Sequence, residues 1–106
     1  MNKLIYLAGP YSYNPEGAFE LHMKYAAHFL AQDIIIFSPI VHNHPLATTH
    51  FLPKDYLFWT NYNRALLLKC DELWVTTEPG WEESKGTLHE ISIAESHKIP
   101  IKYIKI

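Results

Sequence analysis

Four apolar stretches along the chain have the length and composition of β-strands. Leu4 to Ala8 is an unbroken apolar run, which predicts a central strand that is covered on both faces. Ile34 to Phe37 predicts a second buried strand, and Glu72 to Thr76 predicts a third. Ile99 to Ile106 alternates apolar and basic residues, so we expect a half-exposed final strand whose edge is guarded by charge.

The segments between these strands contain apolar residues at helical spacing. The predicted helices run from Pro15 to about Gln32, from Asp55 to Lys69 and from Ser84 to His97. The first helix has a clear start signal, because Asn14 is a good N-cap and proline is favoured at the first helical position. Residues 38–54 contain three prolines and three histidines, and we expect them to form a long loop at the carboxyl edge of the sheet.

The alternation of strands and helices predicts the fold class. Short connections favour parallel pairing, so we expect a three-layer Rossmann-like (flavodoxin-like) α/β domain with a mostly parallel sheet of four to five strands. A chain of 106 residues is expected to form a single domain over residues 1–106. Ligands in such folds bind beyond the carboxyl ends of the strands, where the loops 9–13, 38–53 and 77–84 would meet.

Composition and charge narrow the classes of partner. A hydrophobic fraction of 48% and a net charge of −2 are ordinary for a globular protein and argue against a nucleic-acid polymer or a membrane surface as partner. Cys70 is the only cysteine, which excludes an internal disulfide, and no apolar run approaches the ~20 residues of a membrane span. The charge therefore favours a small molecule or a protein as partner. The first apolar run is too short for a signal peptide, so a cytoplasmic location is expected.

The predicted helix from Ser84 to His97 carries a carboxylate on its inner face. At about 100° per residue, one arc of this helix contains Gly86, Thr87, Glu90, Ile91, Ile93 and Ala94. Burying an unpaired charge is costly, so an inward Glu90 needs a physical reason. Either Glu90 acts as a nucleophile or general base, or it is a structural carboxylate that pairs with Arg64 or a lysine.

Four segments of the chain resemble those of one protein superfamily. They are Tyr6-Leu-Ala-Gly-Pro-Tyr-Ser12, Phe37-Ser-Pro-Ile-Val-His42, Cys70-Asp-Glu-Leu-Trp-Val75 and Gly80-Trp-Glu-Glu-Ser-Lys-Gly-Thr-Leu-His-Glu90. In this order they resemble the nucleoside 2-deoxyribosyltransferase superfamily, most closely its small uncharacterised branch, the DUF1937 family. The resemblance covers nearly the whole chain and is less specific about the substrate.

The resemblance implies roles for residues of the third predicted helix. In characterised relatives, a glutamate at the position of Glu90 attacks the anomeric carbon of a 2′-deoxyribosyl group, and a glycine at the position of Gly86 keeps the approach open. An adjacent carboxylate can stabilise the oxocarbenium character of the sugar and then capture it covalently. A serine at the position of Ser84 helps hold a 5′-phosphate in nucleotide-hydrolysing relatives, although Ser84 can equally be only the helix N-cap.

The resemblance also implies contacts from the other loops. Gly9, Tyr11 and Ser12 occupy the loop after the first strand, which contacts sugar, phosphate or base in relatives; Tyr11 can equally be a packing aromatic. Trp81 lies on the break before the third helix and is a candidate for stacking on a base.

Asn63 departs from the superfamily pattern. Relatives commonly carry an aspartate eight positions before Asp71 that helps handle the leaving base or the sugar hydroxyl, whereas this chain has Asn63. An amide in that catalytic position can form hydrogen bonds but cannot act as an acid or a base. Protonation of the leaving base would then come from elsewhere, with His42 and His44 as candidates.

The histidines of residues 38–54 could be interpreted as a metal site. Alternating imidazoles on an extended segment share a side, which would bring His42 and His44 together with His50. However, no carboxylate or cysteine is close in sequence, and the resembled enzymes need no metal. We therefore expect no metal and no other cofactor, and we expect His42 to lie in the wall of the pocket.

These observations give one preferred function and two others. The preferred hypothesis is cleavage or transfer at the N-glycosidic bond of a 2′-deoxyribonucleoside or its 5′-monophosphate, with Glu90 as the nucleophile. The alternative is a nucleotide-binding sensor module with little or no turnover, which Asn63 favours, and a third is a structural subunit with a vestigial crevice. Relatives complete their pockets with a neighbouring chain, so a homodimer or larger homo-oligomer is expected.

Overall fold

The structure, a computed structural model, describes residues 2–105, in which strands alternate with helices. The elements are β1 (Leu4–Ala8), α1 (Pro15–Leu30), β2 (Ile35–Phe37), α2 (Pro39–His50), α3 (Tyr56–Leu67), β3 (Glu72–Thr76), the 3-10 turn η1 (Trp81–Glu83), α4 (Lys85–Ser96) and β4 (Ile101–Ile104). The four strands of this described part all pair in parallel, in the order β2-β1-β3-β4. The expected three-layer, Rossmann-like α/β fold is therefore confirmed.

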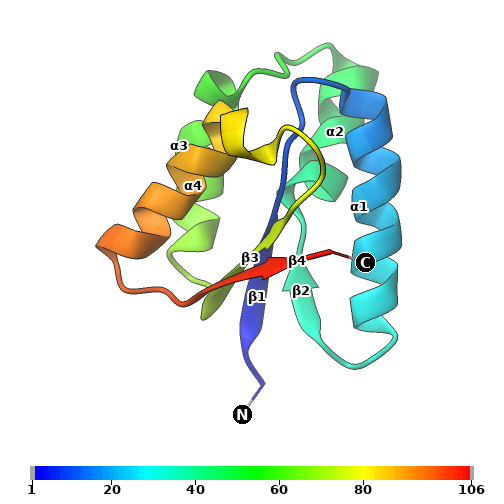
Figure 1. Ribbon diagram of the computed structural model, residues 1–106. Helices are drawn as coiled ribbons and strands as arrows, with labels where there is room; N and C mark the ends of the chain where they lie inside the picture. The colour runs from blue at the N-terminus through cyan, green and yellow to red at the C-terminus, as the bar shows by residue number, and fades with distance from the viewer. Residues whose placement is uncertain (1, 106) are drawn as a thin grey trace.

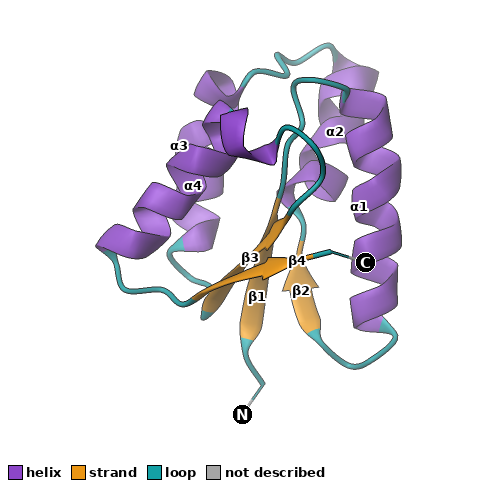
Figure 2. Ribbon diagram, in the orientation of Figure 1, coloured by secondary structure: helices purple, strands orange, loops and turns teal. Residues whose placement is uncertain are grey.

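Helices cover both faces of the sheet (Figures 1 and 2). α1 lies against one face, whereas α3 and α4 lie against the other (Figure 1). Successive residues of β1 point to opposite faces, so Ile5 and Leu7 pack with Tyr25 of α1, and Tyr6 and Ala8 pack toward α3 and α4. β1 is thus buried on both faces, as its unbroken apolar sequence predicts.

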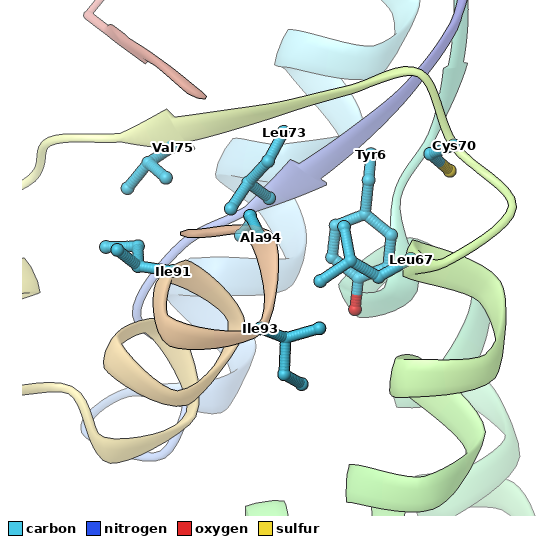
Figure 3. Packing of buried hydrophobic residues seen from close by; sticks show 9 residues of the cluster. Tyr6, Leu67, Cys70, Leu73, Val75, Ile91, Ile93 and Ala94 are labelled. Atoms are coloured by element: carbon cyan, nitrogen blue, oxygen red, sulfur yellow. The ribbon is translucent and has the colours of Figure 1, made fainter. Parts of the chain in front are cut away.

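The larger core lies between the sheet and the pair of helices α3 and α4 (Figure 3). Leu73 and Val75 of β3 pack here with Leu67 of α3 and Ile91 of α4. Full burial of one such side chain stabilises the fold by about 1.5–3 kcal/mol. Tyr6 belongs to the same layer, but its hydroxyl end points away from the sheet (Figure 3), so this core contains a polar group that needs a partner.

The strand order reverses at β1. β2 pairs with one side of β1 and β3 with the other, and the chain leaves these strands toward helices on opposite faces of the sheet. In parallel α/β sheets such a switch point leaves a crevice outside the carboxyl ends of the strands. The topology therefore places the expected ligand site beyond the end of β1.

Residues 38–54 do not form the long loop that the sequence predicted, because most of them belong to helix α2. Ser38 is the N-cap, and its Oγ accepts a hydrogen bond from the backbone N–H of Val41 at 3.1 Å. Pro39 occupies the first helical position, where proline is favoured, and only Pro45 lies inside the helix. Packing of α2 against α1 and β1 offsets the backbone hydrogen bond that Pro45 cannot donate.

The exposure and length of the two edge strands agree only partly with the prediction. β2, predicted to be buried, is an edge strand in which Ile35 is 44% exposed. β4 is the other edge and is half-exposed as expected, although it is shorter than predicted, and Ile106 lies outside the described residues. Lys102 of β4 lies over the ring of Trp74, with Nζ 4.7 Å from the ring centroid, so this charge covers the sheet face beside the edge.

The remaining elements agree with the predicted bounds. β1 and β3 agree to the residue, and α1, α3 and α4 end within about two residues of the predicted positions. None of the helices formed by residues 2–105 is both long and apolar enough to cross a membrane.

Candidate active site

A crevice opens beyond the carboxyl end of β1, at the switch point of the sheet. It holds about 730 Å³ of empty space, part of which is open to solvent. Its walls come from the loop after β1, from α2, from α3 and the segment before it, and from the first turns of α4. Polar side chains on these walls include those of Tyr11, Asn43, His44, Asn63, Thr87 and Glu90.

Glu90 lies on the inner face of α4, as its position on the helix predicts. The side chain is buried, and its Oε2 accepts a short hydrogen bond from the hydroxyl of Tyr6. The structural alternative, an ion pair with Arg64 or a lysine, is not formed by residues 2–105. The carboxylate therefore has a neutral donor and no opposite charge as its partner.

The environment of Glu90 changes its acidity. Burial raises the pKa of Glu90 from 4.5 to about 7, and the hydrogen bond from Tyr6 opposes this rise by stabilising the charged form. The pKa of Tyr6 is raised well above its usual value by burial and by the charge of Glu90. Tyr6 therefore remains a donor, and Glu90 changes between acid and carboxylate near neutral pH. Such a group can serve as a nucleophile or a general base.

The amino end of α4 forms a second part of the crevice. Ser84 is the N-cap, and its Oγ accepts a hydrogen bond from the N–H of Thr87 at 3.4 Å. Thr87 Oγ1 is buried and has no hydrogen-bond partner among residues 2–105. Lys54 and Arg64 line the same crevice. Free backbone N–H groups and the helix dipole favour an anionic group at this end, and the two cations add positive charge to the crevice as a whole.

Two glycines lie where a side chain would meet close neighbours, and the contact is much closer at Gly9 than at Gly86. A Cβ on Gly9 would lie 2.2 Å from Thr76 Oγ1 and 2.5 Å from His22 Nε2, so only glycine lets the loop after β1 rest on this buried pair. A Cβ on Gly86 would lie 3.3 Å from Cβ of Tyr56. Gly86 therefore permits the close approach of α4 to the start of α3, which is a structural reason for a glycine at this position.

Asn63 faces the crevice from α3 and is oriented by Asn43 of α2. The Nδ2 group of Asn43 donates a hydrogen bond to Oδ1 of Asn63 at 2.9 Å. This contact leaves the Nδ2 hydrogens of Asn63 as donors toward the crevice. Asn43 was missed because its segment was expected to be a loop. Its spacing from Ile40 and Ala47, which are buried on the same helix, is the sequence signal that could have found it.

Tyr11 forms a chain of polar contacts with His44 and Glu16. The hydroxyl of Tyr11 lies 2.6 Å from Nδ1 of His44, and Nε2 of His44 lies 3.0 Å from Oε1 of Glu16. The ring of Phe19 stacks on His44 with 4.7 Å between centroids. The contacts join the loop after β1, α1 and α2, and both Tyr11 and His44 line the crevice.

Seven of the nine residues that the sequence predicted for the site line this crevice. These are Gly9, Tyr11, Ser12, Asn63, Ser84, Gly86 and Glu90. His42 lies outside it, exposed on α2, where Nδ1 contacts Oδ1 of Asn43 at 2.8 Å and the ring stacks on Tyr62. Trp81 also lies outside it, since its ring packs on Tyr103 with 5.3 Å between centroids.

The helical conformation of α2 also removes the geometric basis for a histidine metal site. His42 and His44 are two positions apart on a helix, which turns their side chains to different faces. Within residues 2–105, no group of three or more His, Cys, Asp or Glu side chains is placed to hold a metal ion.

The fold and the crevice define an α/β protein with a parallel sheet and a buried carboxylate at its switch point. A family model described as "Domain of unknown function (DUF1937)" matches residues 3–105. The chain therefore belongs to the DUF1937 family. A search of curated proteins finds no match to it.

The raised pKa of Glu90 predicts a specific dependence of stability on pH. The folded state binds this proton more tightly than the unfolded state, so the stability that it contributes is full below pH 4.5 and is lost as pH rises through about 7. At about 1.4 kcal/mol per pH unit, the free energy of unfolding of the wild type should fall by about 3 kcal/mol relative to Glu90→Gln between about pH 4 and pH 8.

Urea denaturation of both proteins at several pH values measures this difference. Glu95→Gln, on the exposed face of the same helix, is the matched control and should show no such trend. A constant difference between wild type and Glu90→Gln would show that the carboxyl group is not perturbed by burial.

Proposed function

We propose that this protein cleaves or transfers at the N-glycosidic bond of a 2′-deoxyribonucleoside or its 5′-monophosphate, with Glu90 as the nucleophile. The observation that carries the proposal is the buried Glu90 carboxyl group, which lies in the crevice with a pKa of about 7 and accepts a hydrogen bond from Tyr6. A substantial fraction of this group is ionised at neutral pH, although it is shielded from water.

The chemistry of N-glycosidic cleavage suits such a group. As the bond between C1′ and the base lengthens, positive charge develops on the sugar, and a carboxylate in a low-dielectric site interacts strongly with that charge. The carboxylate can then capture C1′ as a covalent glycosyl ester. Attack on the ester by water completes hydrolysis, and attack by a second base completes transfer.

The amino end of α4 supports the 5′-monophosphate as a feature of the substrate. Ser84 and the first N–H groups of α4 are available to a phosphate, and Lys54 and Arg64 line the same crevice. Glu90 is farther along the same helix, so a sugar between the phosphate and the base would lie beside its carboxylate. This order of groups along α4 favours a nucleotide over a free sugar.

Membership of the nucleoside 2-deoxyribosyltransferase superfamily is part of the same proposal. The four resembling segments support it, and so does the position of Gly86 and Glu90 in one crevice. Asn63 departs from the superfamily pattern, in which an aspartate is common at this position. It favours a second candidate function, a nucleotide-binding sensor with little or no turnover. In that case the same crevice would bind a nucleotide without an acid to release the base.

An assay for released base tests the proposal. The wild type is expected to release free base from at least one member of a panel of 2′-deoxyribonucleosides and their 5′-monophosphates, as measured by chromatography. Glu90→Gln should lower kcat/KM by at least about a thousandfold, because it removes the nucleophile. Glu95→Gln on the exposed face of α4 is the control and should match the wild type.

Two outcomes of this assay contradict the catalytic proposal. Release of base at equal rates by the wild type and Glu90→Gln would exclude Glu90 as the nucleophile. Tight nucleotide binding without any released base, measured by calorimetry on the wild type, would favour the sensor.

The hydrogen bond from Tyr6 predicts a shift in the pH profile. Tyr6→Phe removes the donor that lowers the pKa of Glu90, so that pKa should rise further above its ordinary value. The acid limb of kcat/KM should then move to higher pH by about one to two units. Tyr103→Phe, which changes an exposed tyrosine of β4, is the control. An unmoved acid limb in Tyr6→Phe would show that Glu90 does not set it.

We also propose that the protein forms a homodimer or larger homo-oligomer. The segment that joins α2 to α3 and the first turn of α3 present exposed apolar residues, with Phe51 91%, Leu57 67% and Phe58 47% exposed. Light scattering at micromolar concentration should give at least twice the mass of the chain, and Leu57→Lys should reduce it. A monomeric wild type would contradict this proposal.

A further inference from the structure

The departure of a nucleobase requires a proton, and the crevice offers few groups that can supply one. Asn63 carries an amide, which is neither an acid nor a base. The guanidinium of Arg64 does not give up its proton in proteins. Glu90 is assigned to C1′ and cannot at the same time protonate the base on the other side of that bond. Among residues 2–105, the remaining ionisable donors that line the crevice belong to Tyr11, His44, Tyr56, His89 and Lys54. His89 and Lys54 are exposed, and the ring of Tyr56 lies against His89.

The contacts of His44 distinguish it from the other candidates. His44 is only 3% exposed, and both of its ring nitrogens have partners, Tyr11 on Nδ1 and Glu16 on Nε2. In contrast, His89 is exposed, and its ring contacts that of Tyr56 at 6.4 Å between centroids. When a buried imidazole lies between a carboxylate and a hydroxyl, the carboxylate fixes a proton on one ring nitrogen. The other ring nitrogen can then exchange a proton with the hydroxyl.

We propose that Glu16, His44 and Tyr11 form a proton relay, in which the Tyr11 hydroxyl is the catalytic acid for the leaving base and His44 and Glu16 are positioning residues. This inference rests on the proposed function. It gives the loop after β1 a chemical role in addition to contact with the ligand, and it provides the acid that Asn63 cannot be.

The two protonation states of His44 determine the direction of the hydrogen bond to Tyr11. Glu16 accepts from Nε2–H in both states, so this nitrogen keeps its hydrogen. When Nδ1 is bare, it accepts the hydrogen of Tyr11, and the phenol then has nothing to donate to a ligand. When Nδ1 also carries a hydrogen, it donates to the Tyr11 oxygen, and the phenol hydrogen is free to point into the crevice. The imidazolium state is therefore the competent one.

The proton transfers balance over the reaction. In the first step Glu90 forms a bond to C1′, and the electron pair of the breaking bond passes to the base nitrogen, which takes the proton of the Tyr11 hydroxyl. Tyr11 recovers a proton from Nδ1 of His44, which leaves neutral imidazole held at Nε2 by Glu16. In the second step water attacks C1′, Glu90 leaves as a carboxylate, and the proton of water returns through Tyr11 to His44.

The surroundings of the relay favour a Tyr11 hydroxyl that passes a proton on and does not remain ionised. Burial and the charge of Glu16 raise the pKa of Tyr11 to about 12, so the phenol alone is a weak acid and needs the imidazolium behind it. The carboxylate of Glu16 faces His44 from α1, with Oε1 3.0 Å from Nε2. Lys54, Arg64 and Glu90 are the other charged groups that line the crevice. Phe19 covers the ring of His44 and limits access of water.

A comparison of two leaving groups tests the relay. One substrate is a 2′-deoxyribonucleoside 5′-monophosphate from which the wild type releases base, and the other carries 4-nitrophenol in place of the base, which departs as an anion without protonation. Tyr11→Phe and His44→Gln should lower kcat/KM for the natural base by about a hundredfold or more. The loss for the nitrophenyl substrate should be much smaller, so the ratio of the two rates should change by at least about tenfold.

The pH profile gives a second readout that a purely structural role would not move. With the natural base, the relay predicts that the alkaline limb of the wild-type profile is absent in His44→Gln. Because His44 is buried, Glu16→Gln is included as a surface variant that tests the same relay with little risk to folding. It should weaken release of the natural base by about tenfold, whereas Glu20→Gln, one turn further along α1 and exposed, should match the wild type.

The possible failures of this experiment can be told apart. Equal losses on both substrates in Tyr11→Phe and His44→Gln would mean that these residues only hold α1 and α2 together, and the relay would be wrong. Loss of the alkaline limb in His89→Gln but not in His44→Gln would assign the acid to His89. A wild type that releases neither base nor nitrophenol overturns the proposed function and the relay with it.

Discussion

The hydrogen bond between Tyr6 and Glu90 joins the centre of the sheet to the helix that carries the carboxylate. Tyr6 is fully buried, so loss of the contact would leave its hydroxyl without a partner in an apolar core. β1 is also the strand at which the strand order reverses, and the crevice opens beyond its carboxyl end. The position of the charge relative to the crevice is therefore fixed by the same contact that makes its burial tolerable.

Much of the fold could be predicted because several elements have a clear signal in their own sequence. β1 and β3 are unbroken apolar runs, and the arc of α4 that contains Glu90 follows from helical spacing alone. α2 could not be predicted in this way. Two of its residues are prolines, and its stability comes from a cap at Ser38 and from packing against α1, neither of which a count of helix-breaking residues includes.

The residues of α4 could be placed together from the sequence alone, whereas several contacts between elements could not. Glu90, Gly86 and Ser84 lie on or next to one helix, so their spacing places them together. Tyr6 was not among the predicted site residues, because the sequence does not show how close β1 lies to α4. Glu16 is on a surface turn of α1, and its contact with His44 depends on the docking of two helices that are distant in sequence.

The crevice wall that contains His44 is a helix, which affects how a ligand would be bound. A loop of similar length would have to be ordered around the ligand, at a cost of about 1–2 kcal/mol for each residue whose backbone is fixed. The twelve residues of α2 are already held by their own hydrogen bonds and by α1. The protein therefore offers a preorganised wall, and discrimination among ligands would depend on fit to a rigid surface instead of on closure around the ligand.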